Sequence, residues 1–194
     1  MTKDYDVLTI GHSTRTLEIF IGMLQANGVQ RVMDIRTVPR SRHNPQFNYD
    51  TLPDALNTAS IGYLHMEGLG GLRHPYANSQ NRGWRNSSFR GFADYMQTAE
   101  FEENLRDLTK LAGQEQIVLM CAESLPWRCH RSLIADALLL RGVPVEHILS
   151  KSRCQPHSLT PWAKVDGTHI TYPVEMITTD KKIGLVQSSR QEVT

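Results

Sequence analysis

The fold is decided by residues 116–141, which read QIVLMCAESLPWRCHRSLIADALLLR. Residues 116–121 form an apolar run of strand length, and residues 122–128 form a polar loop. Leucine, isoleucine and alanine then recur at three- and four-residue spacing, which predicts a helix that ends at Gly142. Residues 142–149 predict the next strand. The stretch therefore predicts a βαβ unit with an unusually reactive first loop.

The N-terminal part of the chain repeats this alternation. Strands are predicted at residues 7–10, 29–35 and 62–66, with helices at residues 17–27 and 50–59. Strands that alternate with helices form a mainly parallel sheet with helices on both faces. The predicted fold is therefore a three-layer α/β domain.

Two regions depart from this alternation. Residues 75–90 show no apolar periodicity and predict a long loop, after which a helical pattern runs from residue 89 to 112, with a break near Thr98. Residues 162–172 predict a small C-terminal hairpin that turns at an Asp-Gly pair. No internal repeat is present.

Size and composition restrict the class of protein. A chain of 194 residues and net charge +1 is expected to form one domain over residues 1–175, with a polar, flexible tail at residues 176–194. Its three cysteines, Cys121, Cys129 and Cys154, are too few for a secreted disulfide scaffold. Neither a signal peptide nor an apolar run of the roughly 20 residues that cross a membrane is evident. We expect a cytoplasmic protein that has no membrane partner.

Polar side chains gather on one side of the predicted sheet. The carboxyl ends of parallel strands meet at one edge, so the loops that leave the strands lie together there. The opposite loops carry little beyond glycines that end helices. The candidate site residues in the strand-end loops are His12, Ser13, Asp34, Arg36, Arg40, Ser41, Gly70, Gly71, Cys121, Glu123, Arg128, Cys129, His130 and Arg131.

Cys121 has two interpretations. A free cysteine at a strand end usually packs as a small apolar residue. Alternatively, Arg128, Arg131 and the helix start lower the thiol pKa from about 8.5 by about 2 units, roughly 2.7 kcal/mol, and make Cys121 a nucleophile. The interval from Cys121 to Arg128 resembles the phosphate-binding loops of cysteine-dependent phosphatases and rhodanese-like transferases. It has six intervening residues where those loops have five and four.

The other candidate residues divide between proton transfer and anion binding. His12 and His130 are candidate proton carriers, and Glu123 is a candidate acid or base. Asp34 is expected to hold neighbouring arginines in place, because they lower the pKa of a carboxyl group and make it a poor base. Three arginines, Arg36, Arg128 and Arg131, are expected to clamp an anion together with N–H groups at the helix start.

Two further features leave alternatives open. Gly70 and Gly71 mark either a turn or a close approach of backbone to a phosphate. Cys129 and His130 could join Cys121 and His12 as zinc ligands, but the close ligand pairs typical of zinc sites are missing, so no cofactor is expected.

The basic residues suggest a nucleic-acid partner as an alternative to an anionic small molecule. Every Lys or Arg between Asp4 and Thr109 is arginine, which forms bidentate contacts with phosphate. The loops 36–42 and 73–90 are rich in arginine, and the second also carries Trp84, which either stacks on a base or packs the loop onto the domain.

Several of these motifs together resemble a known family. They are Gly11-His12-Ser13, Asp34-Ile35-Arg36 with Pro39 and Ser41, Leu69-Gly70-Gly71, and Cys121-Ala122-Glu123 with Pro126 and Cys129-His130-Arg131. In this order they resemble the family catalogued as domain of unknown function 488, over roughly residues 5–175. The resemblance implies a single α/β domain in a bacterial-type cytosolic protein.

Three functions are therefore expected, in decreasing order of support. The first is a Cys-dependent hydrolase or transferase that acts on a phosphate-bearing or other anionic substrate. The second is a nucleic-acid-binding or repair-associated module without covalent chemistry, and the third is a metal-dependent hydrolase. The oligomeric state is left open.

Overall fold

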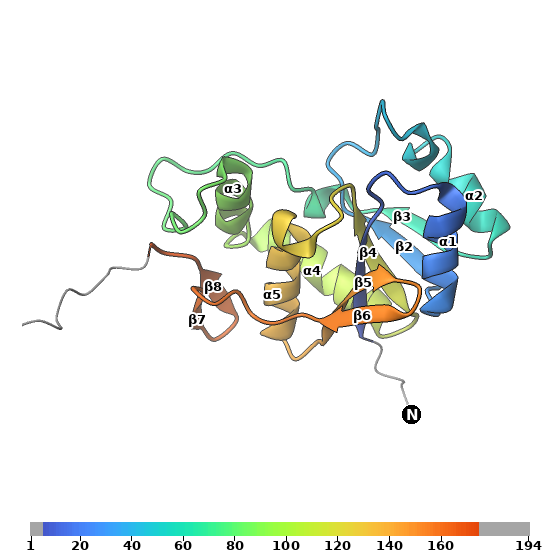
Figure 1. The fold of residues 1–194 in the computed structure, drawn as a ribbon. Coiled ribbons are helices and arrows are strands. Elements are labelled where there is room, and N and C mark those ends of the chain that lie inside the picture. The colour runs from blue at the N-terminus through green and yellow to red at the C-terminus, as the bar shows by residue number, and fades with distance from the viewer. Residues whose placement is uncertain (1–5, 175–194) are drawn as a thin grey trace, which may run out of the picture.

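Five parallel strands and one antiparallel strand form the central sheet of the computed structural model, which describes residues 6–174 (Figure 1). The strand order is β3-β2-β4-β1-β5-β6, and β6 is the antiparallel strand at one edge. The strands are β1 (Val7–Gly11), β2 (Arg31–Asp34), β3 (Gly62–His65), β4 (Ile117–Cys121), β5 (Val145–Ser150) and β6 (Arg153–Pro156). The predicted α/β fold with a mainly parallel sheet is confirmed.

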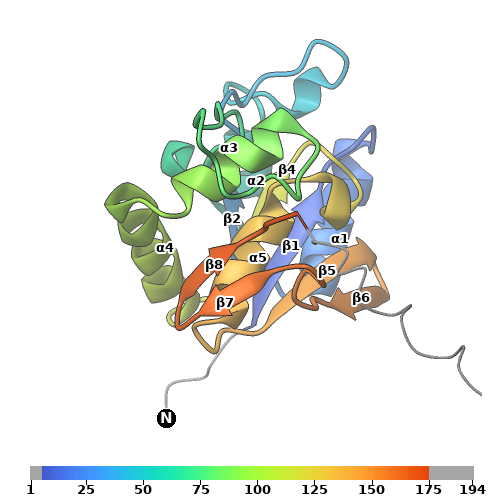
Figure 2. The same ribbon diagram turned by 90° about the vertical axis from the view of Figure 1, so that its left-hand side faces the viewer.

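Helices cover both faces of the sheet. One face packs against α1 (Leu17–Ala26) and α2 (Leu52–Thr58). The other packs against α3 (Ser87–Tyr95), α4 (Ala99–Ala112) and α5 (Arg131–Leu139), which lie in front of the strands in Figure 2. Each face therefore has its own buried core. Three short 3-10 helices, η1 (Pro45–Phe47), η2 (Glu67–Leu69) and η3 (Pro126–Arg128), lie in the loops.

Local capping explains the helix boundaries. The hydroxyl of Thr16 accepts a hydrogen bond from the N–H of Ile19 at the start of α1. At the start of α4, the hydroxyl of Thr98 accepts one from the N–H of Phe101. The break expected near Thr98 is therefore a cap. The Asn86 side chain accepts hydrogen bonds from the N–H groups of Ser88 and Phe89, so α3 begins inside the predicted loop 75–90.

The C-terminal part contains one strand, β6, that the sequence did not predict. The strand β6 has no apolar run, since its residues lie at an exposed edge and it ends at Pro156, a residue that sheets tolerate at an edge. The hairpin of β7 (Lys164–Asp166) and β8 (His169–Thr171) is confirmed, with Gly167 at a φ of +58° in its turn. The tail predicted at residues 176–194 lies outside the described residues.

The ends of β1 and β4 meet at the carboxyl edge of the sheet. Gly11 pairs with Cys121 in the parallel register, and the N–H groups of His12 and Ser13 donate to the carbonyl groups of Cys121 and Ala122, each at 2.9 Å. A Cβ on Gly11 would lie 1.8 Å from the carbonyl oxygen of Glu123. The loop after β4 therefore rests directly on the end of β1, which fixes the position of Cys121.

Candidate functional site

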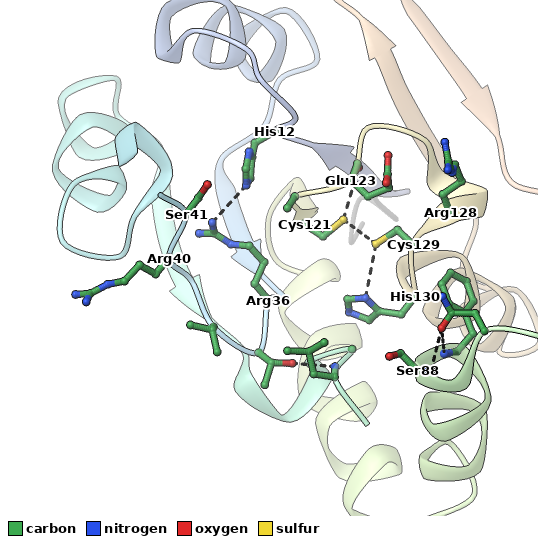
Figure 3. Close-up of a pocket in the computed structure, with 17 residues that line it drawn as sticks. His12, Arg36, Arg40, Ser41, Ser88, Cys121, Glu123, Arg128, Cys129 and His130 are labelled. Carbon is green, nitrogen blue, oxygen red and sulfur yellow. Dashed lines mark hydrogen bonds between the residues drawn. The ribbon is translucent and has the colours of Figure 1, made fainter. Parts of the chain in front are cut away.

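A cavity of about 380 Å³ lies at the carboxyl edge of the sheet (Figure 3). Ten of the fourteen candidate residues line it, so the strand-end loops converge as the topology requires. These ten are His12, Arg36, Arg40, Ser41, Gly71, Cys121, Glu123, Arg128, Cys129 and His130. Ser13, Asp34, Gly70 and Arg131 lie outside the lining.

Two cysteines form the centre of the cavity wall. Cys121 ends β4 and Cys129 precedes α5, and their sulfur atoms lie 2.7 Å apart in hydrogen-bonding contact. Their exposed fractions are 3% and 6%. The Sγ of Cys129 also lies 3.6 Å from Nδ1 of His130. Figure 3 shows this line of two sulfur atoms and an imidazole.

The two thiols have opposite acidities. Burial on its own raises the pKa of Cys121, but the S–H of Cys129 donating to it and the positive charge of Arg131 outweigh burial and lower that pKa. Burial and the contact with Cys121 raise the pKa of Cys129 well above its ordinary value. Cys121 is therefore the more acidic thiol of the pair, and Cys129 is the one that holds its proton more strongly.

Arg131 lies behind the cavity wall as a buried cation. Its exposed fraction is 1%, and its Nη2 donates to the carbonyl groups of Glu123 and Ser124 at 2.7 and 2.8 Å. Within residues 6–174, its Nε and Nη1 have no hydrogen-bond partner, and it forms no ion pair with a carboxylate. A buried charge needs a counter-charge. Cys121 is an acidic group whose pKa this charge lowers, so an ionised Cys121 would supply the counter-charge.

His130 is held with a defined tautomer. Its Nε2 faces the carbonyl oxygens of Leu69 and Ile35 at 3.0 and 3.2 Å, so this nitrogen carries the proton. Burial foremost lowers the pKa of His130 from 6.5 to about 4, so the ring is neutral at pH 7. Its Nδ1 is therefore a proton acceptor directed at Cys129.

His12 is a second neutral histidine. Its ring stacks on Phe47 with centroids 4.3 Å apart, and its Nδ1 donates to the carbonyl of Ser13 at 2.8 Å. Burial foremost, with the charge of Arg36, lowers the pKa of His12 to about 4. Its Nε2 faces Nη1 of Arg36 at 3.4 Å. His12 can accept a proton at the cavity, but it has none to donate there.

Asp34 holds Arg36 from below the cavity. Its two carboxylate oxygens accept from Nε and Nη2 of Arg36 at 2.8 and 2.5 Å, and the hydroxyl of Tyr63 donates to it at 2.7 Å. The Nη2 of Arg36 also donates to the carbonyl of Phe47. Asp34 is thus positioned as an ion-pair partner, as expected, and Arg36 presents one edge of its guanidinium group to the cavity.

The glycines are sites of close approach between side chains and backbone. A Cβ on Gly71 would lie 2.3 Å from Nδ1 of His130, and one on Gly70 would lie 2.5 Å from the hydroxyl of Thr37. Gly71 therefore lets the loop pack against the His130 ring. Ser13 has a φ of 52°, in the left-handed region, and turns the chain out of β1 beside the cavity.

The rim of the cavity carries exposed charge. The Arg40 side chain is 74% exposed and lies 3.9 Å from Asp50, and Arg128 is also exposed. Glu123 is half-buried and accepts from the N–H of Leu125 at 3.4 Å. Arg40, Arg128 and Glu123 are therefore the charged groups that a ligand would meet first.

The start of α5 differs from the expectation of a free N–H cradle. The N–H groups of Ser132 and Leu133 donate to the carbonyl groups of Cys129 and His130, at 3.1 and 3.0 Å. The backbone of this turn thus satisfies its own donors, and the prediction that helix-start N–H groups face the anion is wrong for these two residues. The positive groups near Cys121 are side chains.

Sequence reasoning missed several residues of the cavity wall. They are Thr37, Val38, Leu72, Asn86, Ser88, Phe89 and Ala122. Three of them come from the start of α3, and an Asn followed by two serines was the available signal for a capped helix. The contact between Cys121 and Cys129 was also missed, although a strand end and the next helix start are neighbours in a βαβ unit.

In the arginine-rich loop 73–90, Asn86, Ser88 and Phe89 line the cavity, while Trp84 and the arginines of this loop do not. The Trp84 ring packs against Phe89, Trp162 and Tyr172, with centroids 4.9 to 5.5 Å away. The guanidinium group of Arg73 lies over the Tyr95 ring at 3.7 Å. Trp84 therefore packs its loop onto the domain, while Arg82 and Arg85 are exposed.

Within residues 6–174, no group of three or more His, Cys, Asp or Glu side chains is arranged to hold a metal ion. The same residues include no helix with the length and apolar character that a membrane span requires.

One of the comparisons with known proteins identifies a family. Searches of curated proteins and of solved structures found no match. The family model described as "Domain of unknown function DUF488" matches residues 16–138, a range that includes most of the cavity wall, from Arg36 to His130. The chain therefore belongs to the DUF488 family.

Proposed function

We propose that the protein is a thiol-dependent enzyme in which Cys121 attacks a phosphate-bearing or similarly anionic substrate, as a hydrolase or transferase. The observation that carries the proposal is the environment of Arg131. This buried cation lacks a carboxylate partner within the described residues and lowers the pKa of a thiol that lines the cavity. An ionised thiol at a cavity wall is a nucleophile.

The charge of the cavity supports an anionic substrate. Arg36, Arg40 and Arg128 line it, against the single carboxylate of Glu123. Asp34 neutralises Arg36, which leaves Arg40 and Arg128 at the rim as cations without a buried partner. Guanidinium groups bind phosphate and carboxylate by paired hydrogen bonds. The volume of about 380 Å³ suits a small molecule.

The proton acceptors of the cavity have distinct roles in this proposal. In this proposal neutral His12 releases the hydrogen bond that its Nε2 accepts from Arg36 and takes a proton there, so it serves as the base that activates water for release of an S-linked intermediate. Glu123 lies half-exposed at the rim, where a leaving group departs, and is the candidate acid for that group. His130 lines the same cavity, but its Nδ1 faces Cys129, so the proposal assigns it no contact with the substrate.

Alkylation of Cys121 tests the proposal. Iodoacetamide is added across pH 5 to 9, and the alkylated peptides are identified by mass spectrometry. We expect Cys121 to react below the ordinary thiol pKa of about 8.5, and inorganic phosphate to slow the reaction. Cys154→Ser is the control, because Cys154 lies on β6 outside the cavity lining and its thiol donates to Asn27. A Cys121 that ionises above pH 8 and ignores phosphate excludes the proposed nucleophile.

A further inference from the structure

The proposed function assigns no role to Cys129, although Cys129 lines the cavity. A second thiol beside a thiolate nucleophile is not needed to attack an anionic substrate. Its position is nevertheless well defined, because its sulfur lies between Cys121 Sγ at 2.7 Å and His130 Nδ1 at 3.6 Å. Each of these three groups lines the same cavity.

The two sulfur atoms are close enough to bond with little rearrangement. A disulfide needs a sulfur–sulfur distance of about 2.05 Å, so the pair has to close by roughly 0.7 Å. Cys121 ends β4 and Cys129 lies at the end of η3, joined by a short loop whose base rests on Gly11. The loop can therefore bring the atoms together without displacing the sheet.

The two cysteines differ in the way that a two-step oxidation requires. The pKa of Cys121 is lowered, in part by the charge of Arg131, so Cys121 is the first of the two to react with an electrophile. Cys129 keeps its proton, and the neutral His130 beside it has Nδ1 directed at that sulfur. Cys129 thus becomes a nucleophile when His130 takes its proton.

The burial of the pair selects the oxidant. With exposed fractions of 3% and 6%, the sulfur atoms are reached through the cavity, and a small reagent reaches them most easily. Small hydroperoxides are two-electron oxidants that convert a thiolate to a sulfenic acid. A bulky disulfide has to pass the Arg40 and Arg128 rim and place its own sulfur against Cys121.

We propose that Cys121 and Cys129 form a redox couple that reduces small hydroperoxides, with His130 as the base for the second step. The Cys121 thiolate attacks the terminal oxygen of ROOH, the O–O bond breaks, and RO⁻ leaves as ROH with a proton from solvent. Cys121 is then a sulfenic acid. Cys129 passes its proton to His130 Nδ1 and attacks Cys121 sulfur. The S–O bond breaks, and the departing hydroxide takes that proton and leaves as water.

The net change is ROOH and two thiols to ROH, water and one disulfide. A small-molecule thiol returns the couple to its reduced form and is itself oxidised to its disulfide. The couple rests on the ionised Cys121 of the proposed function but is independent of the anionic substrate. The two proposals therefore fail in different experiments.

The test treats the reduced full-length protein with one equivalent of hydrogen peroxide and follows its thiols by mass spectrometry. We expect the wild-type protein and the Cys154→Ser control to form a disulfide between Cys121 and Cys129. In Cys129→Ser we expect Cys121 to stop as a sulfenic acid that dimedone traps. In Cys121→Ser we expect Cys129 to remain a thiol. With dithiothreitol as reductant, the wild type consumes peroxide repeatedly and Cys121→Ser does not.

Substitution of His130 tests the second step. In His130→Asn we expect disulfide formation to slow by about 100-fold at pH 7, the low end of the range for loss of a general base, while sulfenic acid forms at the wild-type rate. Raising the pH toward the pKa of Cys129 is expected to restore the rate. The circular dichroism spectrum and the unaffected first step show that this variant is folded.

Each of the following outcomes would overturn one part of the proposed redox couple. Sulfinic acid on wild-type Cys121 without a disulfide removes Cys129 as the resolving thiol. If glutathione disulfide forms the disulfide between Cys121 and Cys129 and peroxide does not, the hydroperoxide is excluded as the substrate. A protein that is inert to peroxide but whose Cys121 alkylation is still slowed by phosphate overturns the redox couple and leaves the proposed function standing.

Discussion

Arg36 and Arg131 are both buried beside the same cavity, with exposed fractions of 7% and 1%, but their surroundings differ. Arg36 has a bidentate ion pair with Asp34 and donates to the carbonyl of Phe47. Arg131 has two carbonyl acceptors and two nitrogens without a partner among the described residues. One arginine is paired with a carboxylate within the fold, and the other has no carboxylate partner among the described residues.

The difference separates a cation that has a structural partner from one to which the proposed function assigns a role. Asp34 neutralises the charge of Arg36, so the Arg36 side chain contributes rigidity to the cavity wall. The Arg131 charge remains available, and its effect is recorded in the lowered pKa of Cys121. We make four predictions from this contrast. Each concerns a substitution or a pH change that alters one of the two arginines or a group beside them.

Replacing Arg36 is expected to have the largest effect on stability. Arg36→Met leaves Asp34, which has no exposed surface, as a buried carboxylate without its cation. Breaking a buried pair from one side costs about 3–5 kcal/mol, measured as the change in free energy of unfolding by chemical denaturation. Arg40→Met is the matched control, because its exposed side chain contributes within about 0.5 kcal/mol. Equal stability of both variants would contradict the structural role of Arg36.

Acid is expected to destabilise the protein through the histidines beside the two arginines. The pKa values of His12, His130 and His147 are each lowered from 6.5 to about 4, mainly by burial. Between these values the unfolded chain binds more protons than the folded protein, so stability falls as pH falls.

The shift of a single such histidine corresponds to about 3 kcal/mol. Denaturation curves recorded from pH 7 to pH 4 measure the loss. Removing the exposed His74 by His74→Gln is expected to leave the slope unchanged. A stability that is flat over this range would show that the three rings are not buried as neutral groups.

Adding a methyl group at Gly11 is expected to disturb the loop after β4, whose carbonyl groups hold Arg131. The Cβ of Gly11→Ala would lie 1.8 Å from the Glu123 carbonyl and 2.9 Å from Nη1 of Arg131. Overpacking of this kind costs about 1–3 kcal/mol, and displacement of Arg131 should also reduce Cys121 reactivity. Gly113→Ala is the control, since the nearest atoms to its Cβ are 3.6 Å away. A Gly11→Ala protein with wild-type stability and alkylation rate would refute the close packing of this loop.

Replacing Arg131 is expected to affect chemistry more than stability. Arg131→Met removes the charge that lowers the pKa of Cys121, so alkylation at pH 7 should slow by about tenfold for each unit by which that pKa rises. No carboxylate within the described residues loses its partner, so the stability cost should be smaller than for Arg36→Met.

Arg128→Met is the control for this variant. Arg128 lies at the exposed rim, so its loss should weaken protection by phosphate and leave ionisation of Cys121 unchanged. If Arg131→Met reacts at the wild-type rate, the counter-charge assigned to Arg131 is wrong.

The sequence predicted the fold and the convergence of the loops, because both follow from patterns that extend over many residues. Apolar periodicity in residues 116–141 identifies β4 and α5, and parallel topology then places Cys121, Arg36 and His12 at one edge. The strand β6 escaped prediction because an exposed edge strand buries little apolar surface and leaves no periodic signal.

The finer features of the site depend on the conformation of a single loop. Whether Cys129 touches Cys121 is decided by η3, and whether Arg131 is buried is decided by how the Glu123 and Ser124 carbonyls fold over it. Residue types at fixed spacing do not determine these contacts. The roles assigned to Cys121, His12, His130 and Glu123 remain predictions for the experiments described above.

The register between β1 and β4 has a chemical consequence. Side chains along a strand alternate between its faces, so a slip of β4 by one residue would turn Cys121 toward α1 and bring Met120 to the α5 side. The same thiol would then be buried among apolar side chains, away from Arg131, and would only fill space in the core. Hydrogen bonds between two backbones, far simpler than any catalytic motif, thus decide whether this sulfur is reactive.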